Sequence, residues 1–422
     1  MNPQGGFSPG YSSYVLGVCF LLTALNVMDR QVLSILVEPV RAEFSLSDAQ
    51  MGLLTGSAFA FSHALAMIPL ARLADIGSRR NVIAAGLFLW STFTAVTGAA
   101  TAYWHMFLTR VGVGAFETVG SGPAQSLLSD YFPPERRGSA MSIHAAGGTL
   151  GAMAGFTIGG LLADTVGWRW TFVCFGAPGL LLALVIWTTV REPRRGVFDG
   201  PEADEPAPTL RETLAYLGSL RSFRHVVLAA SLNSFVNWGM LSWAAAAMMR
   251  AHDMSMTEAG VRLATSMTLP SATGLILAGL ITDRLGRRDP RWYLWFLAVS
   301  STLAIPFSLT FLLSDDPSVA FVWLVPGAFL NSMWVGTYNA VVQSVAKPRM
   351  RAMASAVHVL VSSGLIGTGL GPLFVGVVSD ALEPSYGVDS LRYALAIAAF
   401  AHLWGATHSM LSSRTYLSDI DR

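Results

Sequence analysis

Two ten-residue stretches decide the architecture of this chain, because they are copies of one another. The first is Ala71-Arg-Leu-Ala-Asp-Ile-Gly-Ser-Arg-Arg80, and the second is Gly279-Leu-Ile-Thr-Asp-Arg-Leu-Gly-Arg-Arg288. They lie 208 positions apart, and each follows a long apolar run. A second pair of copies, residues 137–144 and 351–358, has the same spacing from its Arg to its His. The chain therefore consists of two halves that repeat one another.

The composition shows where such a chain can reside. Of its 422 residues, 53% are hydrophobic and only 13% are charged, whereas an average soluble domain has roughly twice that charged fraction. This excludes a soluble enzyme, a disordered chain and a secreted disulfide scaffold. Cys19 and Cys174, the two cysteines, lie in apolar runs and suggest neither a metal site nor a disulfide framework.

Apolar windows long enough to cross a bilayer, about 20 residues each, recur along both halves. We predict an all-α polytopic membrane protein with twelve transmembrane helices in two pseudo-symmetric six-helix bundles, residues 1–190 and 224–422, joined by a cytoplasmic linker, residues 191–223. The predicted spans are 12–38, 48–74, 81–101, 105–131, 138–163 and 169–190, then 224–250, 257–282, 292–313, 319–345, 352–379 and 390–412.

The polar segments predict the topology. Residues 1–13 contain no Lys or Arg, so the first apolar run is expected to be retained as a helix rather than cleaved as a signal peptide. Most arginines fall in loops on one side, which predicts that both termini are cytoplasmic and that the membrane is the inner (plasma) membrane. In the linker, residues 199–208 are rich in proline and acid, and residues 209–222 fit either an amphipathic surface helix or a disordered tether.

The repeated loop resembles the cytoplasmic signature of the major facilitator superfamily, Gly-x-Leu-Ala-Asp-Arg-x-Gly-Arg-Arg/Lys. The second copy matches almost fully, whereas the first departs at Ala71, Ile76 and Ser78. The resemblance covers essentially the whole chain and implies that the loops gate the cytoplasmic side, with Asp283 facing Arg136 and Arg137, and Asp75 facing Arg349 and Arg351. The gating residues expected are Asp75, Arg79, Arg80, Arg136, Arg137, Asp283, Arg287, Arg288, Arg349 and Arg351.

Four charges of the first and fourth predicted spans are candidates for a functional site. Asp29 and Arg30 are in the first span, and Arg110 and Glu117 are two turns apart on one face of the fourth. Charges in a membrane are costly and usually mark a substrate path or a proton relay. Because Arg cannot deprotonate, Asp29 and Glu117 are the proton-coupling candidates, and Arg30 and Arg110 are candidates for binding an anionic substrate. The alternative is a permanent ion-pair clamp between the two helices.

The same residues refine the resemblance. Asn26-x-x-Asp29-Arg30, together with Arg110-x-x-x-Gly-x-x-Glu117 and the run from Leu128 to Arg137, resembles the Spinster branch of the superfamily. That resemblance implies proton-linked movement of lysophospholipids or sphingosine-phosphate-like lipids. Organic-anion symporters of the superfamily share the charged patterns of both helices, and residues 167–170 (Gly-Trp-Arg-Trp) resemble them too.

Other polar residues in the spans are candidates for lining the substrate path, although helix packing explains each one singly. They are Asn233, Asn237, Trp238, Asn331, Tyr338 and Asn339 in the second half, and His144 and His358, which occupy equivalent repeat positions. His63 is a weaker candidate of the same kind.

The sequence also excludes several kinds of chemistry. It contains no nucleotide-binding phosphate loop and no hydrolase or metalloprotease motif. We therefore expect a monomeric secondary transporter that uses protons, works by alternating access, and has no cofactor, no metal and no nucleic-acid partner. The alternatives are an organic-anion or multidrug carrier and, in a different class, a lipid-modifying enzyme or receptor on a transporter scaffold.

Overall fold

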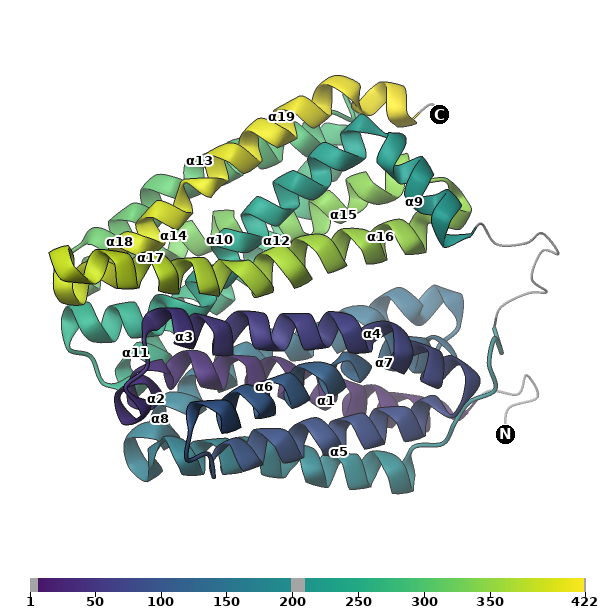
Figure 1. Ribbon diagram of the computed structural model, residues 1–422. Helices are drawn as coiled ribbons and strands as arrows, with labels where there is room; N and C mark the ends of the chain where they lie inside the picture. Colours follow the sequence, from purple (N-terminus) through teal and green to yellow (C-terminus); the bar gives the residue numbers. More distant parts are fainter. Residues whose placement is uncertain (1–6, 199–208, 421–422) are drawn as a thin grey trace. The chain divides into compact units, whose positions relative to one another are not determined.

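The computed structural model describes residues 7–198 and 209–420, and within those ranges the chain is helical with no strand (Figure 1). Part of the predicted linker, residues 199–208, lies outside them. The helices of the first half are α1 (Pro9–Ile35), α2 (Val37–Phe44), α3 (Asp48–Gly52), α4 (Ala58–Ile76), α5 (Arg79–Thr97), α6 (Tyr103–Glu117), α7 (Gly122–Ser129) and α8 (Pro134–Thr189).

The second half repeats this pattern. Its helices are α9 (Leu210–Ser219), α10 (Arg221–His252), α11 (Met256–Leu263), α12 (Leu269–Gly286), α13 (Trp292–Leu313), α14 (Pro317–Asn331), α15 (Trp334–Val345), α16 (Arg351–Val359), α17 (Gly371–Tyr386), α18 (Ser390–Ala399) and α19 (Ala401–Ile420). π-Helical turns at Leu53–Ser57, Ala264–Thr268 and Leu360–Leu370 join α3 to α4, α11 to α12 and α16 to α17. Of the two alternatives for residues 209–222, a helix is present as α9, which begins with a capping box of Thr209 and Glu212.

The predicted twelve spans are confirmed by these elements. Among the described residues, seven helical stretches are long and apolar enough to cross a membrane. Two of the seven contain two passes each, namely Pro134–Thr189 and Pro348–Ile420. The remaining three spans are α5, α6 with α7, and α10. The chain is an all-α, multi-pass membrane protein.

The two passes within α8 are separated at Gly167, where the backbone has φ 80° and ψ 163°. An L side chain rarely adopts a positive φ of this kind, so glycine allows the chain to leave one helix and begin the next. The first pass packs against α1, and the second packs against α5. Both passes are therefore anchored in the first half.

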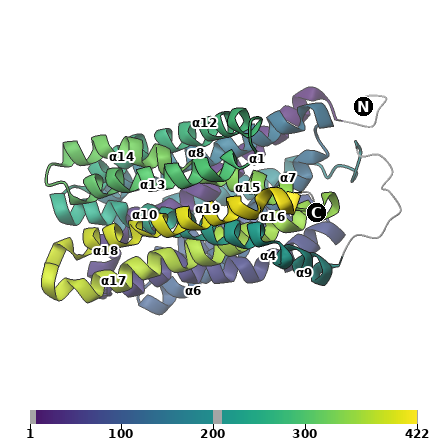
Figure 2. The same cartoon turned by 90° about the horizontal axis from the view of Figure 1, so that it is seen from above.

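The helices form two compact units that exchange short segments. Unit 1 comprises residues 1–46, 58–204 and 255–261, and unit 2 comprises residues 47–57, 205–254 and 262–422. In unit 1, α1 and α5 pack on α8, and α4 and α5 pack on α6. In unit 2, α10 packs along α19, and α13 packs along α14 and α19 (Figures 1 and 2). The predicted boundaries at residues 190 and 224 stay a prediction.

In unit 2, the exchanged segment 47–57 docks on α17 through a glycine and an aspartate. A Cβ at Gly376 would lie 2.2 Å from the Asp48 carbonyl oxygen, so only glycine permits this approach. Four residues later, the Asp380 carboxylate accepts hydrogen bonds from the backbone N–H groups of Asp48 and Ala49 at 2.8 and 2.9 Å. A carboxylate at a helix N-terminus is favoured by the helix dipole as well as by these bonds.

Unit 1 repeats the arrangement with its own exchanged segment, residues 255–261. A Cβ at Gly160 would lie 2.3 Å from the Met256 carbonyl oxygen, and the Asp164 carboxylate accepts a 2.7 Å hydrogen bond from the Thr257 N–H. The Gly-x-x-x-Asp pattern of residues 160–164 and 376–380 is thus a structural repeat. In each unit it docks the N-terminal end of a helix that begins in the other sequence half.

Candidate substrate and proton site

Unit 1 brings together all four of the predicted intramembrane charges. Asp29 and Arg30 come from α1, and Arg110 and Glu117 come from α6. Asp29, Arg110 and Glu117 are buried, with exposed fractions of 2%, 3% and 0%. The Nε of Arg30 donates a hydrogen bond to Glu117 Oε1, which forms an ion pair between the first and fourth spans. The two helices are therefore in direct contact through this pair.

The local backbone explains why Glu117 lies where it does. Glu117 is the last residue of α6 and is followed by a short 3-10 turn, Thr118–Gly120. The side-chain amide of Asn26 on α1 donates to the Glu117 carbonyl oxygen at 3.3 Å, satisfying a backbone acceptor at the helix end. Gly114 lets α6 approach α4 closely, because a Cβ there would lie 2.4 Å from the Phe59 carbonyl oxygen.

Phe59 on α4 is a site residue that sequence reasoning missed. The Arg30 guanidinium carbon lies 4.7 Å from the centroid of its ring, and that of Arg110 lies 5.5 Å from it. His63 stacks on the same ring at 5.4 Å. Two cations thus lie against one aromatic ring, which stabilises them without neutralising their charge. A phenylalanine in an apolar run carries no signal of this role in the sequence.

Several atoms of the cluster have unused bonding capacity. Thr94 on α5 donates to Asp29 Oδ2 at 3.2 Å. Asp29 Oδ1, Glu117 Oε2 and Arg110 Nε, however, find no hydrogen-bond partner among the residues that the structure describes. Buried polar atoms are nearly always satisfied in native proteins, so such atoms commonly mark a functional site. Two carboxylate oxygens are available to accept a proton, and one guanidinium nitrogen is available to donate to an anion.

The buried polar residues of unit 2 form a different, uncharged network. Asn233 Oδ1 accepts from Ser301 Oγ at 2.8 Å and lies 3.0 Å from His402 Nδ1. Asn233 Nδ2 lies 3.3 Å from the Tyr338 hydroxyl, which is 2.7 Å from Ser409 Oγ. Asn233 and Tyr338 were predicted from the sequence, whereas Ser301, His402 and Ser409 were not. The only sequence signal for them is a polar side chain in an apolar span.

The other candidates of the second half are only partly brought together. Asn331, the last residue of α14, donates through Nδ2 to Asn237 Oδ1 on α10 at 3.2 Å. Trp238 follows on α10 and is half-buried. Asn339 on α15 is also half-buried, and its Oδ1 has no hydrogen-bond partner within the described ranges. The amide pair Asn237–Asn331 is therefore distinct from the Asn233 network.

The two repeat-related histidines are both buried, His144 in unit 1 and His358 in unit 2. His144 is buried, and its Nδ1 is 3.1 Å from the Cys19 carbonyl oxygen and 3.0 Å from Thr23 Oγ1. His358 is also buried, and its Nδ1 has no hydrogen-bond partner in the described part of the chain. His144 therefore packs α8 onto α1, as a structural histidine would.

The first copy of the repeated loop contains a buried ion network. Arg79, at the start of α5, donates to Asp130 at 2.5 Å, to Glu192 at 2.8 Å and to the Ser126 carbonyl oxygen at 2.9 Å. Its side chain is 2% exposed. Asp75 is largely exposed and lies 4.0 Å from Arg195. Arg79 thus fastens the loop inside unit 1, a structural role that the gating prediction did not foresee.

The remaining gating candidates are mostly at the surface. In the second copy, Asp283 accepts a 2.7 Å hydrogen bond from the Tyr293 hydroxyl. Arg137 Nε donates to the Ser129 carbonyl oxygen at 3.1 Å. The exposed members are Arg136, Arg287, Arg288, Arg349 and Arg351, and Arg80 is half-buried. Their gating role stays a prediction.

The fold and the buried charges define a class of protein, and the comparisons with known proteins agree. The family model described as Major Facilitator Superfamily matches residues 19–372 and 227–411. This chain belongs to that superfamily and is a membrane transporter, not an enzyme. Within the superfamily it falls in the Spinster branch.

Three relatives place the chain more narrowly. A solved bacterial homologue of the human lysosomal transporter Spinster, in an inward-facing and unoccupied conformation, is 31% identical, with a TM-score of 0.91 over 98% of this chain and 99% of that one. An MFS-type efflux pump of Mycolicibacterium smegmatis is 32% identical over 96% of this chain and 93% of its own length. The sphingosine-1-phosphate transporter SPNS2 of Danio rerio is 26% identical over 96% of this chain and 85% of its own.

Proposed function

We propose that this protein is a proton-coupled secondary transporter of amphiphilic substrates with an anionic head, of the lysophospholipid or sphingosine-phosphate kind. The observation that carries the proposal is the ion pair of half-buried Arg30 with fully buried Glu117, together with the carboxylate of Asp29, one oxygen of which has no hydrogen-bond partner among the described residues. Membrane-embedded carboxylates next to arginines are typical of proton relays and substrate sites.

The coupling follows from competition for Arg30. In the structure, Glu117 accepts from Arg30, and this contact favours the charged carboxylate. An anionic head group that binds Arg30 displaces Glu117, which is then a buried carboxylate without its cation and takes up a proton instead. Binding of substrate and binding of a proton are thereby linked at one pair of residues. Asp29, which is buried and hydrogen-bonded to Thr94, is the second site of proton exchange.

The substrate class is supported by the surroundings of the charges. Arg30 and Arg110 provide positive charge for a phosphate or carboxylate, and the neighbouring faces of Phe59 and His63 suit an apolar body. Two of the relatives named above are a Spinster homologue and a sphingosine-1-phosphate transporter. The efflux pump is the observation that favours the second candidate, a carrier that exports organic anions or drugs.

Alternating access is supported by the exchanged segments. Any movement that frees residues 47–57 from the rest of unit 2 must break two sets of contacts. These are the bonds of Asp380 on α17 to the α3 N-terminus and the bidentate pair of Asp48 with Arg250 on α10, whose nitrogen–oxygen distances are both 2.7 Å. These contacts are polar and local, so they can re-form after each cycle. We further propose that the protein is a monomer in the plasma membrane and that both of its termini lie in the cytoplasm.

The test is transport by purified protein in liposomes under an imposed pH gradient. The substrate panel contains a lysophospholipid, sphingosine phosphate, a neutral analogue of each, and small organic anions. We expect gradient-driven movement of the anionic amphiphiles and little movement of the neutral analogues. Uptake that does not depend on the pH gradient would contradict proton coupling. A preference for small anions would favour the second candidate, the carrier of organic anions or drugs.

A further inference from the structure

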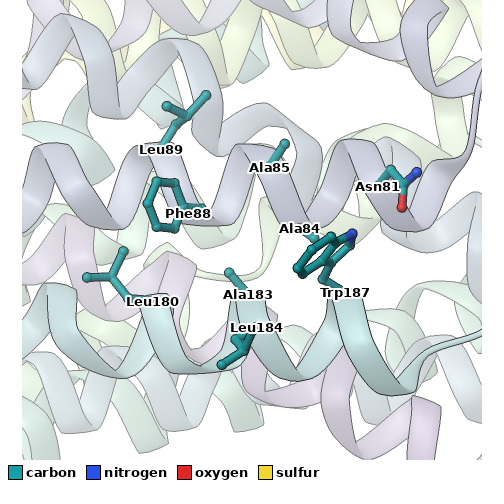
Figure 3. Close-up of a pocket in the computed structure, with 9 residues that line it drawn as sticks. All are labelled: Asn81, Ala84, Ala85, Phe88, Leu89, Leu180, Ala183, Leu184 and Trp187. Carbon is teal, nitrogen blue, oxygen red and sulfur yellow. The ribbon is translucent and has the colours of Figure 1, made fainter.

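A groove on unit 1, away from the charged cluster, has the features of a binding site. It lies between α5 and the second pass of α8 and has a volume of about 770 Å³. Figure 3 shows the residues that line it, among them Phe88 and Leu89 on α5 and Leu180, Leu184 and Trp187 on α8. None of the charged-cluster residues lines it.

The groove is polar at one end and apolar along the rest. In Figure 3 the amide of Asn81 and the indole nitrogen of Trp187 lie at the same end, whereas Leu89, Phe88 and Leu180 lie toward the other. Phe88, Leu184 and Trp187 are 52%, 54% and 59% exposed. On a transmembrane helix such surfaces face lipid, and tryptophan is enriched where the hydrocarbon meets the head groups. The shape and chemistry match a molecule with a polar head and an acyl chain.

At the polar end of the groove, the positively charged side chain of Arg80 is hydrogen-bonded to Asn81. The Nε and Nη2 atoms of Arg80 donate to Asn81 Oδ1 at 2.9 and 2.8 Å. The neighbouring Arg79 is neutralised by Asp130 and Glu192. The Arg80 side chain, by contrast, has no carboxylate within ion-pair distance among the residues that the structure describes; Glu192 meets only its backbone N–H, at 2.9 Å.

We propose that this groove binds an anionic phospholipid of the surrounding bilayer, with one acyl chain between α5 and α8 and the phosphate at Arg80, Asn81 and Trp187. Arginine beside an amide donor is suited to a phosphate, and basic pockets at helix ends are a known way to recognise anionic lipid head groups. The lipid would fasten α5 to α8 across the groove. This site is independent of the proposed transport function.

The test is native mass spectrometry of the full-length protein in mixed micelles with phosphatidylglycerol or phosphatidylcholine of equal chain length. The wild type is expected to retain one phosphatidylglycerol in preference to phosphatidylcholine. Arg80→Gln should weaken this retention about tenfold or more, because a charge-assisted hydrogen bond is lost. Ala85→Trp, which fills the groove from its exposed side, should reduce retention of either lipid.

The repeat provides a matched control. Arg288 occupies the position of Arg80 in the second copy of the loop and is exposed, so Arg288→Gln should leave lipid retention unchanged. Equal losses in Arg80→Gln and Arg288→Gln, or equal retention of the two lipids by the wild type, would overturn the proposal in favour of ordinary annular lipid. Displacement of phosphatidylglycerol by a transported substrate would also overturn it, because the groove would then belong to the substrate path.

Discussion

The two repeats join their first and fourth spans with different chemistry. In unit 1, Arg30 on α1 is ion-paired with Glu117, the last residue of α6. In unit 2, Asn237 on α10 accepts a hydrogen bond from Asn331, the last residue of α14. Both pairs connect equivalent helices at an equivalent place, the break between the two helices that make up the fourth span of each half.

The two pairs differ in whether they can respond to protons. The hydrogen bond of an amide pair does not depend on pH and carries no charge, so it holds two helices together without responding to protons. A carboxylate paired with arginine is stable when charged, but it takes up a proton when the arginine is withdrawn. We infer that unit 1 carries the proton chemistry and that the amide pair of unit 2 takes no part in it. Four substitutions test this contrast.

The largest effect is expected for Glu117→Gln. The glutamine keeps the size of the side chain but cannot exchange a proton, so gradient-driven transport should fall to background in proteoliposomes. The matched control is Asn331→Leu at the equivalent helix end, which should retain its response to the gradient. A Glu117→Gln protein that accumulates substrate at the wild-type level would show that the ion pair is a permanent clamp.

Asp29→Asn should have the next largest effect. Asp29 is buried, with one oxygen bonded to Thr94 and the other without a hydrogen-bond partner among the described residues. The asparagine should therefore abolish stimulation by the gradient while leaving substrate exchange without a gradient. The measurement is counterflow alongside gradient-driven uptake. Asn237→Ala in the equivalent span serves as the control. Loss of both activities with the protein still folded would place Asp29 in binding rather than in coupling.

Arg30→Ala should reduce affinity selectively. Loss of a charge-assisted hydrogen bond costs about 1.5–3 kcal/mol, which is about tenfold or more in Kd. The penalty should fall on an anionic amphiphile and spare its neutral analogue, as measured by displacement of a bound fluorescent lipid. If both ligands weaken equally, Arg30 acts only through the packing of Phe59 and Glu117.

The smallest effect on transport is expected for Asn233→Ala. The substitution removes the acceptor for Ser301 and His402, and an unsatisfied buried group costs about 1–3 kcal/mol of stability. The thermal midpoint should fall while the dependence on the pH gradient persists. Asn339→Ala is the control, because its Oδ1 has no partner in the described residues. A loss of coupling in Asn233→Ala would break the contrast between the two units.

Much of this organisation could be predicted from the sequence. Long apolar runs predict the spans, because a bilayer leaves the backbone no partner but itself. The repeated loops predict two equivalent halves, and charges within apolar runs predict a site. The residues Phe59 and Thr94 could not be found in this way, because each looks like an ordinary packing residue until the helices are assembled.

The structure also gives two of the predicted site residues a different role from the one that the sequence indicated. Arg79 belongs to a signature associated with gating, yet it is buried between Asp130 and Glu192. Its partners are 51 and 113 positions away along the chain, so no local pattern reveals them. His144 similarly bonds to α1 through Cys19 and Thr23.

The sequence by itself determined that the chain crosses a membrane twelve times and that its halves repeat, since hydropathy and spacing are properties of the chain alone. Tertiary structure alone decided that Arg30 pairs with Glu117, that Phe59 lies under two guanidinium groups, and that Gly376 and Asp380 dock residues 47–57. The physical reason is that pairing of charges and close packing depend on distances between helices. Those distances are set by side chains far apart along the chain.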